Sequence, residues 1–447
     1  MTERRQTTVE IAEAEPQRSG FSLQSLLTLP VLLRGAGSMV LIAALSIFLF
    51  QHWDSGNDLQ RYWMLLGFNA ILAFTGFASG RILGEAKGAR TFLMLALTAI
   101  PINFTILGAF VYTWHPLDNL SASYPEFAFW HIADSVPLAI PLIAGVVVAM
   151  IVSWLGFLVL ARRSALRLAA FSLLANAALL IPVRSADNIA WLLLILVPAL
   201  AYATLVAIRA NPGLKTFEGR IAKLLVWIPV GLILGRTLWL YSISTFLILI
   251  LFVMTWALLR ILAQTLTRQQ VWRQWIEHLS LVAGVGIALS IASLAVEHWG
   301  VETTTAIHLF AYTLAGLTIE LSLRASSSRI TYRQIAALTL IAAPLLALSL
   351  YGSAANAALC MGNGLAILAF GYIMEKRFLL ALGLIAFLAG LGFQIWHAIL
   401  LFDLGGWGSL AALGTLSILA GSVVEKFGTL MKQRLNGFAG KIREWES

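Results

Sequence analysis

Residues 75 to 101 read TGFASGRILGEAKGARTFLMLALTAIP: an apolar run, a basic loop and a second apolar run that ends at a proline. A related stretch, TIELSLRASSSRITYRQIAALTLIAAP, follows 243 residues later at 318 to 344. Two arginines and the proline carry most of the match, and they align without a gap as Arg81/Arg324, Arg90/Arg333 and Pro101/Pro344. This spacing predicts an internal repeat built from pairs of apolar segments.

The composition is that of a membrane protein. Of 447 residues, 60% are hydrophobic and only 11% are charged, whereas charged residues make up about a quarter of a soluble domain. The single cysteine, Cys360, excludes an internal disulfide and a cysteine-based metal cluster. The first apolar segment lacks a small-residue cleavage site, so we expect a retained anchor and not a signal peptide.

Apolar runs long enough to cross a hydrocarbon core of about 30 Å recur along the whole chain. We expect each run to be an α-helix, because backbone polar groups in lipid must be satisfied within the segment. The fourteen predicted helices cover residues 35–51, 62–80, 91–112, 136–160, 165–182, 188–208, 221–240, 243–263, 279–297, 304–322, 333–351, 357–373, 378–400 and 406–424.

Lysine and arginine gather in alternate loops, which in membrane proteins face the cytoplasm. With the N-terminus placed inside, 27 of the 30 basic residues fall on the inner side, and Arg61, Arg184 and Arg236 fall outside. We therefore expect a multi-pass protein of a bacterial inner membrane with both termini cytoplasmic. The net charge of +9 then predicts attraction to anionic lipid headgroups, and nucleic acid is not an expected partner.

The predicted fold is all-α: a polytopic transmembrane bundle of about fourteen helices. Two six-helix repeats separated by an even number of helices must be parallel. The GxxxG pairs Gly76/Gly80 and Gly231/Gly235 predict close contacts between helices. The expected segments are a cytoplasmic tail with an interfacial stretch (1–33), a first repeat (34–210), a two-helix insert with an interfacial loop (211–277), a second repeat (278–424) and an amphipathic basic tail (425–447).

Interruptions at matching places in two halves are the best sequence indication of a transporter's substrate site. Pro101 and Pro344 each lie near the middle of a predicted helix, where proline frees a carbonyl in the preceding turn. Thr98, Asn103 and Thr105 surround the first proline, and their polar groups either repair that loss or bind a substrate. Both interpretations stay open: packed kinks, or a substrate-binding site made of these five residues.

A second group of candidates lies at the outer ends of the helices. His52, Trp53 and Asp54 follow the first predicted helix, and His298 and Trp299 stand at the matching place in the second half. Histidine at such a position suits a pH sensor, a metal ligand or a proton relay. His-Trp pairs also belong to the aromatic belt of the membrane interface.

Outer carboxylates keep an enzymatic function among the alternatives. Asp54, Asp58 and Asp134 suit a transferase that needs a base to deprotonate its acceptor, or form a solvated rim. No histidine pair has the spacing of a helical metal site, and no cofactor motif is present in the sequence. We therefore expect neither a metal nor a cofactor, and assign no catalytic residue.

Two resemblances extend these observations. The stretch Gly35 to Tyr112 resembles the N-terminal unit of bacterial polytopic membrane proteins known only as a domain of unknown function, which place a tryptophan-containing turn after the first helix and a basic loop after the second. The 6 + 2 + 6 layout is similar to that of the fourteen-helix branch of the major facilitator superfamily. Gly80, Glu85, Gly88 and Arg90 approximate that superfamily's loop motif.

Three functional classes remain. Transport or flipping of a neutral, amphipathic or lipid-linked substrate accounts for the duplication and the paired prolines. A non-catalytic component of cell-envelope assembly or sensing is the first alternative. A membrane enzyme with an outward-facing site that acts on a lipid-linked substrate is the second. Membrane lipids and a lipid-linked or amphipathic small-molecule substrate are the expected partners, and the sequence does not identify a protein partner.

Overall fold

The structure is a computed structural model that describes residues 29–50, 58–114, 130, 132, 137–182, 185–211, 214, 216–240, 243–265, 270–325, 328–401, 415, 418 and 422. These residues contain helices and loops and no strand. Thirteen of their helices are long and apolar enough to cross a membrane. The described part of the chain is therefore all-helical and has the helices of a multi-pass membrane protein.

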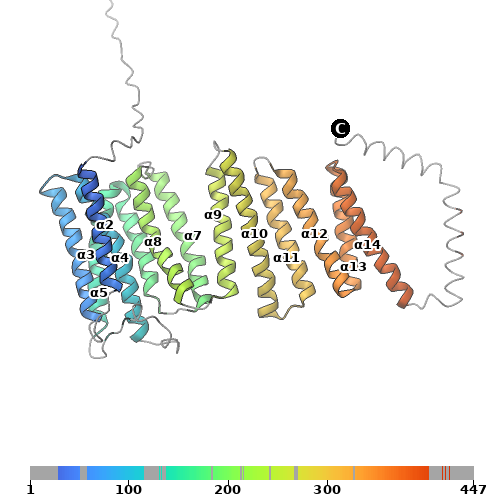
Figure 1. Ribbon diagram of the computed structural model, residues 1–447, viewed down its shortest axis with the longest axis horizontal. Helices are drawn as coiled ribbons and strands as arrows, with labels where there is room; N and C mark the ends of the chain where they lie inside the picture. The colour runs from blue at the N-terminus through green and yellow to red at the C-terminus, as the bar shows by residue number, and fades with distance from the viewer. Residues whose placement is uncertain are drawn as a thin grey trace, which may run out of the picture. The chain divides into compact units, whose positions relative to one another are not determined.

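Contacts divide the chain into two units, coloured blue to green and green to red in Figure 1. The first unit, residues up to Arg184 and Leu192–Tyr241, holds α2 (Leu29–Phe50), α3 (Asp58–Arg81), α4 (Ala86–Trp114), α5 (Ala139–Leu160), α6 (Ala165–Ala177), most of α7 (Ala186–Ala210) and α8 (Phe217–Leu240). The second unit holds α9 (Thr245–Thr265), α10 (Gln270–Trp299), α11 (Thr303–Arg324), α12 (Arg329–Tyr351), α13 (Ala354–Ile373) and α14 (Arg377–Leu401).

The first thirteen predicted spans each coincide with one of these helices. The fourteenth, 406–424, lies outside the described residues except for three isolated positions, and the basic tail at 425–447 lies wholly outside them. The interfacial stretch predicted at the N-terminus is described only from Leu29, where α2 begins.

Several predicted helix starts differ from the structure, and the largest difference is at α10. The helix expected at 279–297 begins at Gln270, so the Trp272–Trp275 stretch forms the first turns of α10 and not a separate interfacial segment. Arg273 and Glu277, one helical turn apart, form an ion pair at 3.0 Å that stabilises this extension. The continuous apolar pattern begins at about residue 279, whereas the helix itself begins at Gln270.

The core of the first unit lies where α3, α4 and α5 meet. It is built from buried apolar side chains of α3 and α4 together with two loop residues: Tyr62, Leu65, Leu66, Ile106, Leu107, Phe110, Trp130 and Ile132. Gly156 lets α5 approach α4 closely, because a Cβ there would lie 2.6 Å from a methyl carbon of Leu97. Close backbone approach through small residues is how helices pack in lipid.

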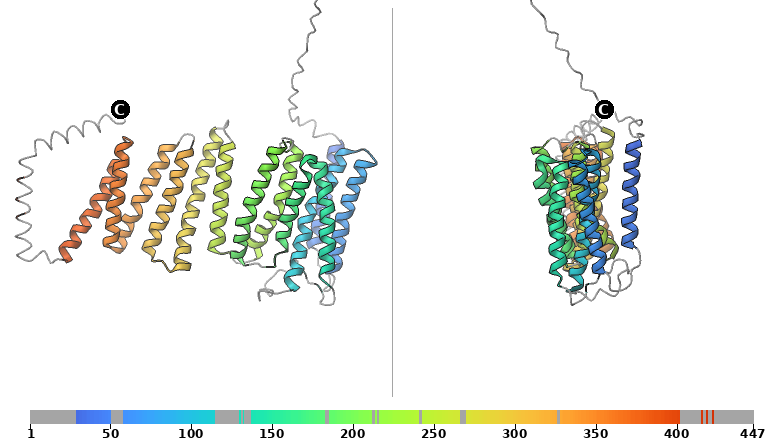
Figure 2. Two further views of the ribbon diagram at one scale, coloured as in Figure 1. Left: turned by 180° about the vertical axis from the view of Figure 1, so that it is seen from behind. Right: turned by 90° about the vertical axis from the view of Figure 1, so that its left-hand side faces the viewer.

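Helix α2 belongs to the first unit but packs loosely on it. None of the residues in Leu32–Leu49 is buried, and Figure 2 shows the helix standing apart from its neighbours. Two polar contacts lie near its ends. Arg34 Nη1 is 3.4 Å from Glu85 Oε1, and Arg61 Nη2 donates to the Leu49 carbonyl at 3.2 Å.

In the second unit, α9 to α14 lie side by side in chain order (Figures 1 and 2). The closest approach is between α13 and α14, which a turn at Met374–Lys376 connects. A Cβ on Gly364 would lie 2.7 Å from the Phe387 nitrogen, and one on Gly383 would lie 2.6 Å from the Leu368 nitrogen. The two backbones are therefore in direct contact.

Candidate functional site

The polar residues around Pro101 bond within their own helix. Pro101 is buried in the interior of α4. Thr98 donates to the Met94 carbonyl, Asn103 to the Ala99 carbonyl and Thr105 to the Pro101 carbonyl, each at 2.8 Å. Such bonds to the carbonyl four residues earlier occupy these groups locally and accompany helix bends.

The same residues do not converge on one face. Asn103 is only 2% exposed, and its Oδ1 has no hydrogen-bond partner among the described residues. Thr98 is exposed on the side of α4 that faces α2. The structure therefore divides the predicted site: Asn103 belongs to the packed interior, and Thr98 belongs to a groove.

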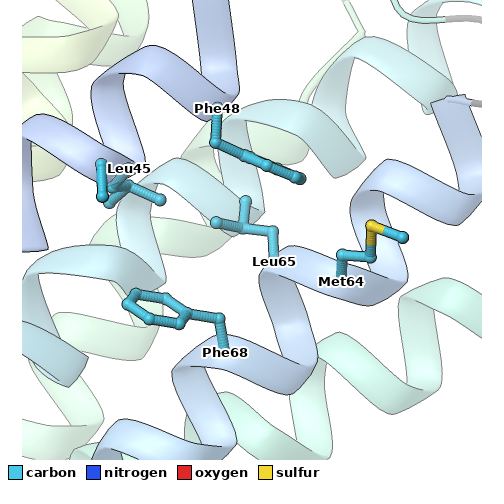
Figure 3. A pocket seen from close by; sticks show the side chains of 6 residues that line it. Leu45, Phe48, Met64, Leu65 and Phe68 are labelled. Atoms are coloured by element: carbon cyan, nitrogen blue, oxygen red, sulfur yellow. The ribbon is translucent and has the colours of Figure 1, made fainter.

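This groove, called the α2 groove below, separates α2 from α3 and α4. Its first part has a volume of about 290 Å³, and Leu45, Phe48, Met64, Leu65 and Phe68 project into it (Figure 3). Its second part, about 160 Å³, shares Leu45 and Phe68 with the first and extends to Thr98. The complete lining is apolar except for two hydroxyls, and consists of Leu41, Ile42, Ala44, Leu45, Ser46, Phe48, Leu49, Met64, Leu65, Phe68, Leu72, Leu95, Thr98, Ala99 and Ile102.

The hydroxyls of the α2 groove are already engaged. Ser46 donates to the Ile42 carbonyl at 2.9 Å, as Thr98 does to its own helix. The groove therefore offers almost purely apolar contact. A surface of this kind suits a hydrocarbon chain better than a polar solute.

Pro344 is handled differently from Pro101. A proline removes the hydrogen bond to the carbonyl four residues earlier, here that of Leu340. Asn363, on α13, donates to this carbonyl from Nδ2 at 2.8 Å, and its side chain also bonds to the Tyr312 hydroxyl of α11. Pro344 is buried, and Asn363 satisfies the Leu340 carbonyl that it frees.

Sequence reasoning missed Asn363. The sequence does contain one indication of this role: Asn363 is an amide in an apolar helix, and the preceding helix contains a proline. Local spacing could not reveal the contact, because the asparagine and the Leu340 carbonyl are 23 residues apart.

Only some of the candidates predicted at the outer ends of the helices lie within the described residues. His52, Trp53, Asp54 and Asp134 lie outside the described residues. His298 and Trp299 are the last two residues of α10, and Trp299 is 74% exposed. This exposure is typical of an interface anchor.

Among the described carboxylates at this end, Asp58 is bound by a neighbour. Its Oδ1 accepts from Arg61 at 3.2 Å, and the guanidinium of Arg61 also lies 4.3 Å from the ring centroid of Trp130. Within the described residues, no group of three His, Cys, Asp or Glu side chains is arranged to hold a metal. Asp58 therefore contributes to the fold of the first unit.

A cluster of charges lies at the other end of the second unit, where Glu320 is one helical turn from Arg324. Arg260 lies 3.3 Å from Glu320, which pairs again with Arg324 at 3.2 Å. Glu277 is 1% exposed and pairs with Arg273, whose Nη2 donates to the Arg324 carbonyl. These bonds connect the ends of α9, α10 and α11, and they require Glu277 to lie inside α10, which the predicted helix start excluded.

Comparison of the chain with protein-family models, with curated proteins and with solved structures finds no match.

Proposed function

We propose that the protein transports or flips a neutral, amphipathic or lipid-linked substrate across a bacterial inner membrane. The α2 groove carries this proposal. It is apolar along its length, it lies between one loosely packed helix and the core of the first unit, and it reaches the turn of α4 around Pro101. A substrate with a hydrocarbon chain fits such a surface.

The packing of α2 supports the proposal energetically. Leu32–Leu49 contains no buried residue, and α2 contacts the core of the first unit through the partly buried Leu45, Phe48 and Leu49. Two polar contacts, Arg34 with Glu85 and Arg61 with the Leu49 carbonyl, lie near its two ends. Separating α2 from α3 and α4 therefore breaks few contacts, and we expect this separation to admit a chain from the bilayer.

Helix boundaries support the proposed parallel repeat. Helix α3 ends at Arg81 and α4 begins at Ala86, while α11 ends at Arg324 and α12 begins at Arg329. Both boundaries repeat at the interval of 243 residues found in the sequence. A duplicated unit of this kind is common in secondary transporters.

The experiment is a transbilayer assay with the full-length protein in liposomes that contain a fluorescent phosphatidylglycerol or a fluorescent polyprenyl phosphate. Dithionite bleaches only the outer leaflet of empty liposomes. We expect the wild-type protein to expose label from the inner leaflet as well, because substrate moves along the α2 groove. Ala44→Trp fills the groove from its lining and should slow this exchange about tenfold, which corresponds to a barrier about 1.4 kcal/mol higher.

Ala43→Trp is the matched control, since Ala43 is also exposed on α2 but does not line the groove. If the inner-leaflet label of both lipids stays unbleached in liposomes that contain the wild-type protein, the result would argue against transport. Equal exchange rates for the two tryptophan variants would show that the substrate does not move along the α2 groove.

A further inference from the structure

The second unit has a groove of its own, with a different chemistry. It lies between α11, α12 and α13 and has a volume of about 330 Å³. Its walls are apolar except for one hydroxyl and one guanidinium, and they consist of Ile319, Ser322, Leu323, Arg333, Ala336, Ala337, Leu340, Ala366, Ile367, Phe370 and Met374. Ser322 donates to the Ile319 carbonyl of its own helix at 2.7 Å, so Arg333 is the polar group that characterises this Arg333 groove.

Arg333 is set apart from the other arginines by its partner. Its Nη1 contacts the sulfur of Met374 at 3.3 Å, and no carboxylate lies within ion-pair distance of it among the described residues. Arg90, the matching residue of the sequence repeat, pairs with Glu218 at 2.7 Å. A thioether is a weak acceptor, so the guanidinium of Arg333 keeps most of its hydrogen-bonding capacity.

The surroundings of Arg333 carry positive charge. Arg329 precedes it by one turn of α12, and Lys376 and Arg377 follow Met374 closely in the turn to α14. The nearest acid in the sequence of that turn is Glu375, which is exposed. Basic side chains at the end of a helix pair, beside an apolar groove, form the recognised surface for an anionic lipid headgroup.

We propose that the Arg333 groove binds one phospholipid with an anionic headgroup. Its phosphate accepts hydrogen bonds from the guanidinium of Arg333, whose planar fork matches two phosphate oxygens. Its acyl chain lies along Ala336, Ala337 and Leu340 on one side and Ala366 on the other. This site belongs to the second unit and does not depend on transport through the α2 groove.

The test is a titration of the purified full-length protein with dioleoyl phosphatidylglycerol, followed by native mass spectrometry. We expect one lipid to bind more tightly than the others, and dioleoyl phosphatidylcholine to bind that site about tenfold more weakly. Arg333→Gln should weaken the tight phosphatidylglycerol about tenfold by removing the headgroup contact. Ala366→Phe keeps the charge but fills the groove from its exposed rim, and should weaken the same lipid.

The matched control is Arg167→Gln, which removes one exposed charge from α6 and lines none of the described grooves. Thermal unfolding of each variant without added lipid establishes that it is folded. Unchanged phosphatidylglycerol binding in Arg333→Gln, or equal binding of the two lipids by the wild-type protein, overturns the proposal. An equal loss in Arg167→Gln would also overturn it, because it would indicate general charge attraction.

Discussion

Asn363 and Pro344 form a unit although they lie on different helices. The proline leaves the Leu340 carbonyl without its intrahelical donor, and the asparagine supplies a replacement at 2.8 Å. In lipid no water is present to do this. The asparagine therefore compensates for the proline, and each residue is costly without the other.

Asn363→Ala should lower the free energy of unfolding by about 1–2 kcal/mol, because it leaves the Leu340 carbonyl unsatisfied. Adding Pro344→Ala restores an N–H to α12 and should recover most of this loss. The measurement is a double-mutant cycle by denaturant unfolding in mixed micelles.

Ser349→Ala serves as the control for Asn363→Ala, since Ser349 is exposed and bonds only to the Leu346 carbonyl of its own helix. It should change the stability by less than about 0.5 kcal/mol. Additive losses in the double variant would show that the two residues act separately.

At the scale of helices, glycine placement decides which pairs approach closely. Gly364 on α13 meets Gly383 on α14, while Gly371 faces Leu380 and Gly390 faces Ala357 on the opposite helix. Cβ atoms at all four glycines would lie 2.6 to 2.7 Å from backbone atoms of the partner helix. The seven-residue spacing keeps each pair on one face of its helix. This hairpin therefore depends on the absence of side chains along its seam.

Gly383→Ala should destabilise the protein by about 1–3 kcal/mol, because its Cβ meets the Leu368 backbone at 2.6 Å and must push the helices apart. Gly392→Ala makes the same change on the same helix where nothing lies within 4 Å. It should leave stability unchanged or raise it by up to about 1 kcal/mol through helix propensity. Thermal unfolding in detergent compares the two, and equal midpoints would contradict the importance of the seam.

The sequence predicted the positions of the helices better than the contacts between them. Length and apolarity were sufficient to locate thirteen spans, because lipid imposes both on any crossing helix. The GxxxG pair Gly76/Gly80 does lie against Leu93 and Ala89 of α4. The pair Gly231/Gly235 was expected to contact a helix in the same way, but nothing in the described structure lies within 4 Å of a Cβ built on either glycine. A GxxxG motif shows that a second helix can approach closely, and it does not show that one is present.

The candidate site was predicted less completely than the spans. Pro101 and Thr98 could be selected because proline is conspicuous in an apolar run. Asn103 was grouped with them by proximity in sequence, although it points into the packed interior. The α2 groove could not be predicted from the sequence, because it results from the loose packing of α2, in which no residue of Leu32–Leu49 is buried.

At the scale of the molecule, the alternation of basic loops gives an orientation that is open to measurement. We expect the turn at Lys376 and the C-terminus to face the cytoplasm, and Gly300 to face outward. In a Cys360→Ser background, which removes the only cysteine, an impermeant maleimide should label Gly300→Cys in intact cells but neither Lys376→Cys nor Ser447→Cys. Labelling of Ser447→Cys together with Gly300→Cys would instead mean thirteen spans.

The turn between α13 and α14 has a consequence for biosynthesis. Because Met374–Lys376 is short and glycines line the contact between the two helices, we expect α13 and α14 to pair as soon as both have left the ribosome. Lys376 and Arg377 lie in or beside that turn, and basic residues at such a place favour its retention on the cytoplasmic side. We therefore expect the pair to carry its own insertion signal and not to inherit its orientation from the helices made before it.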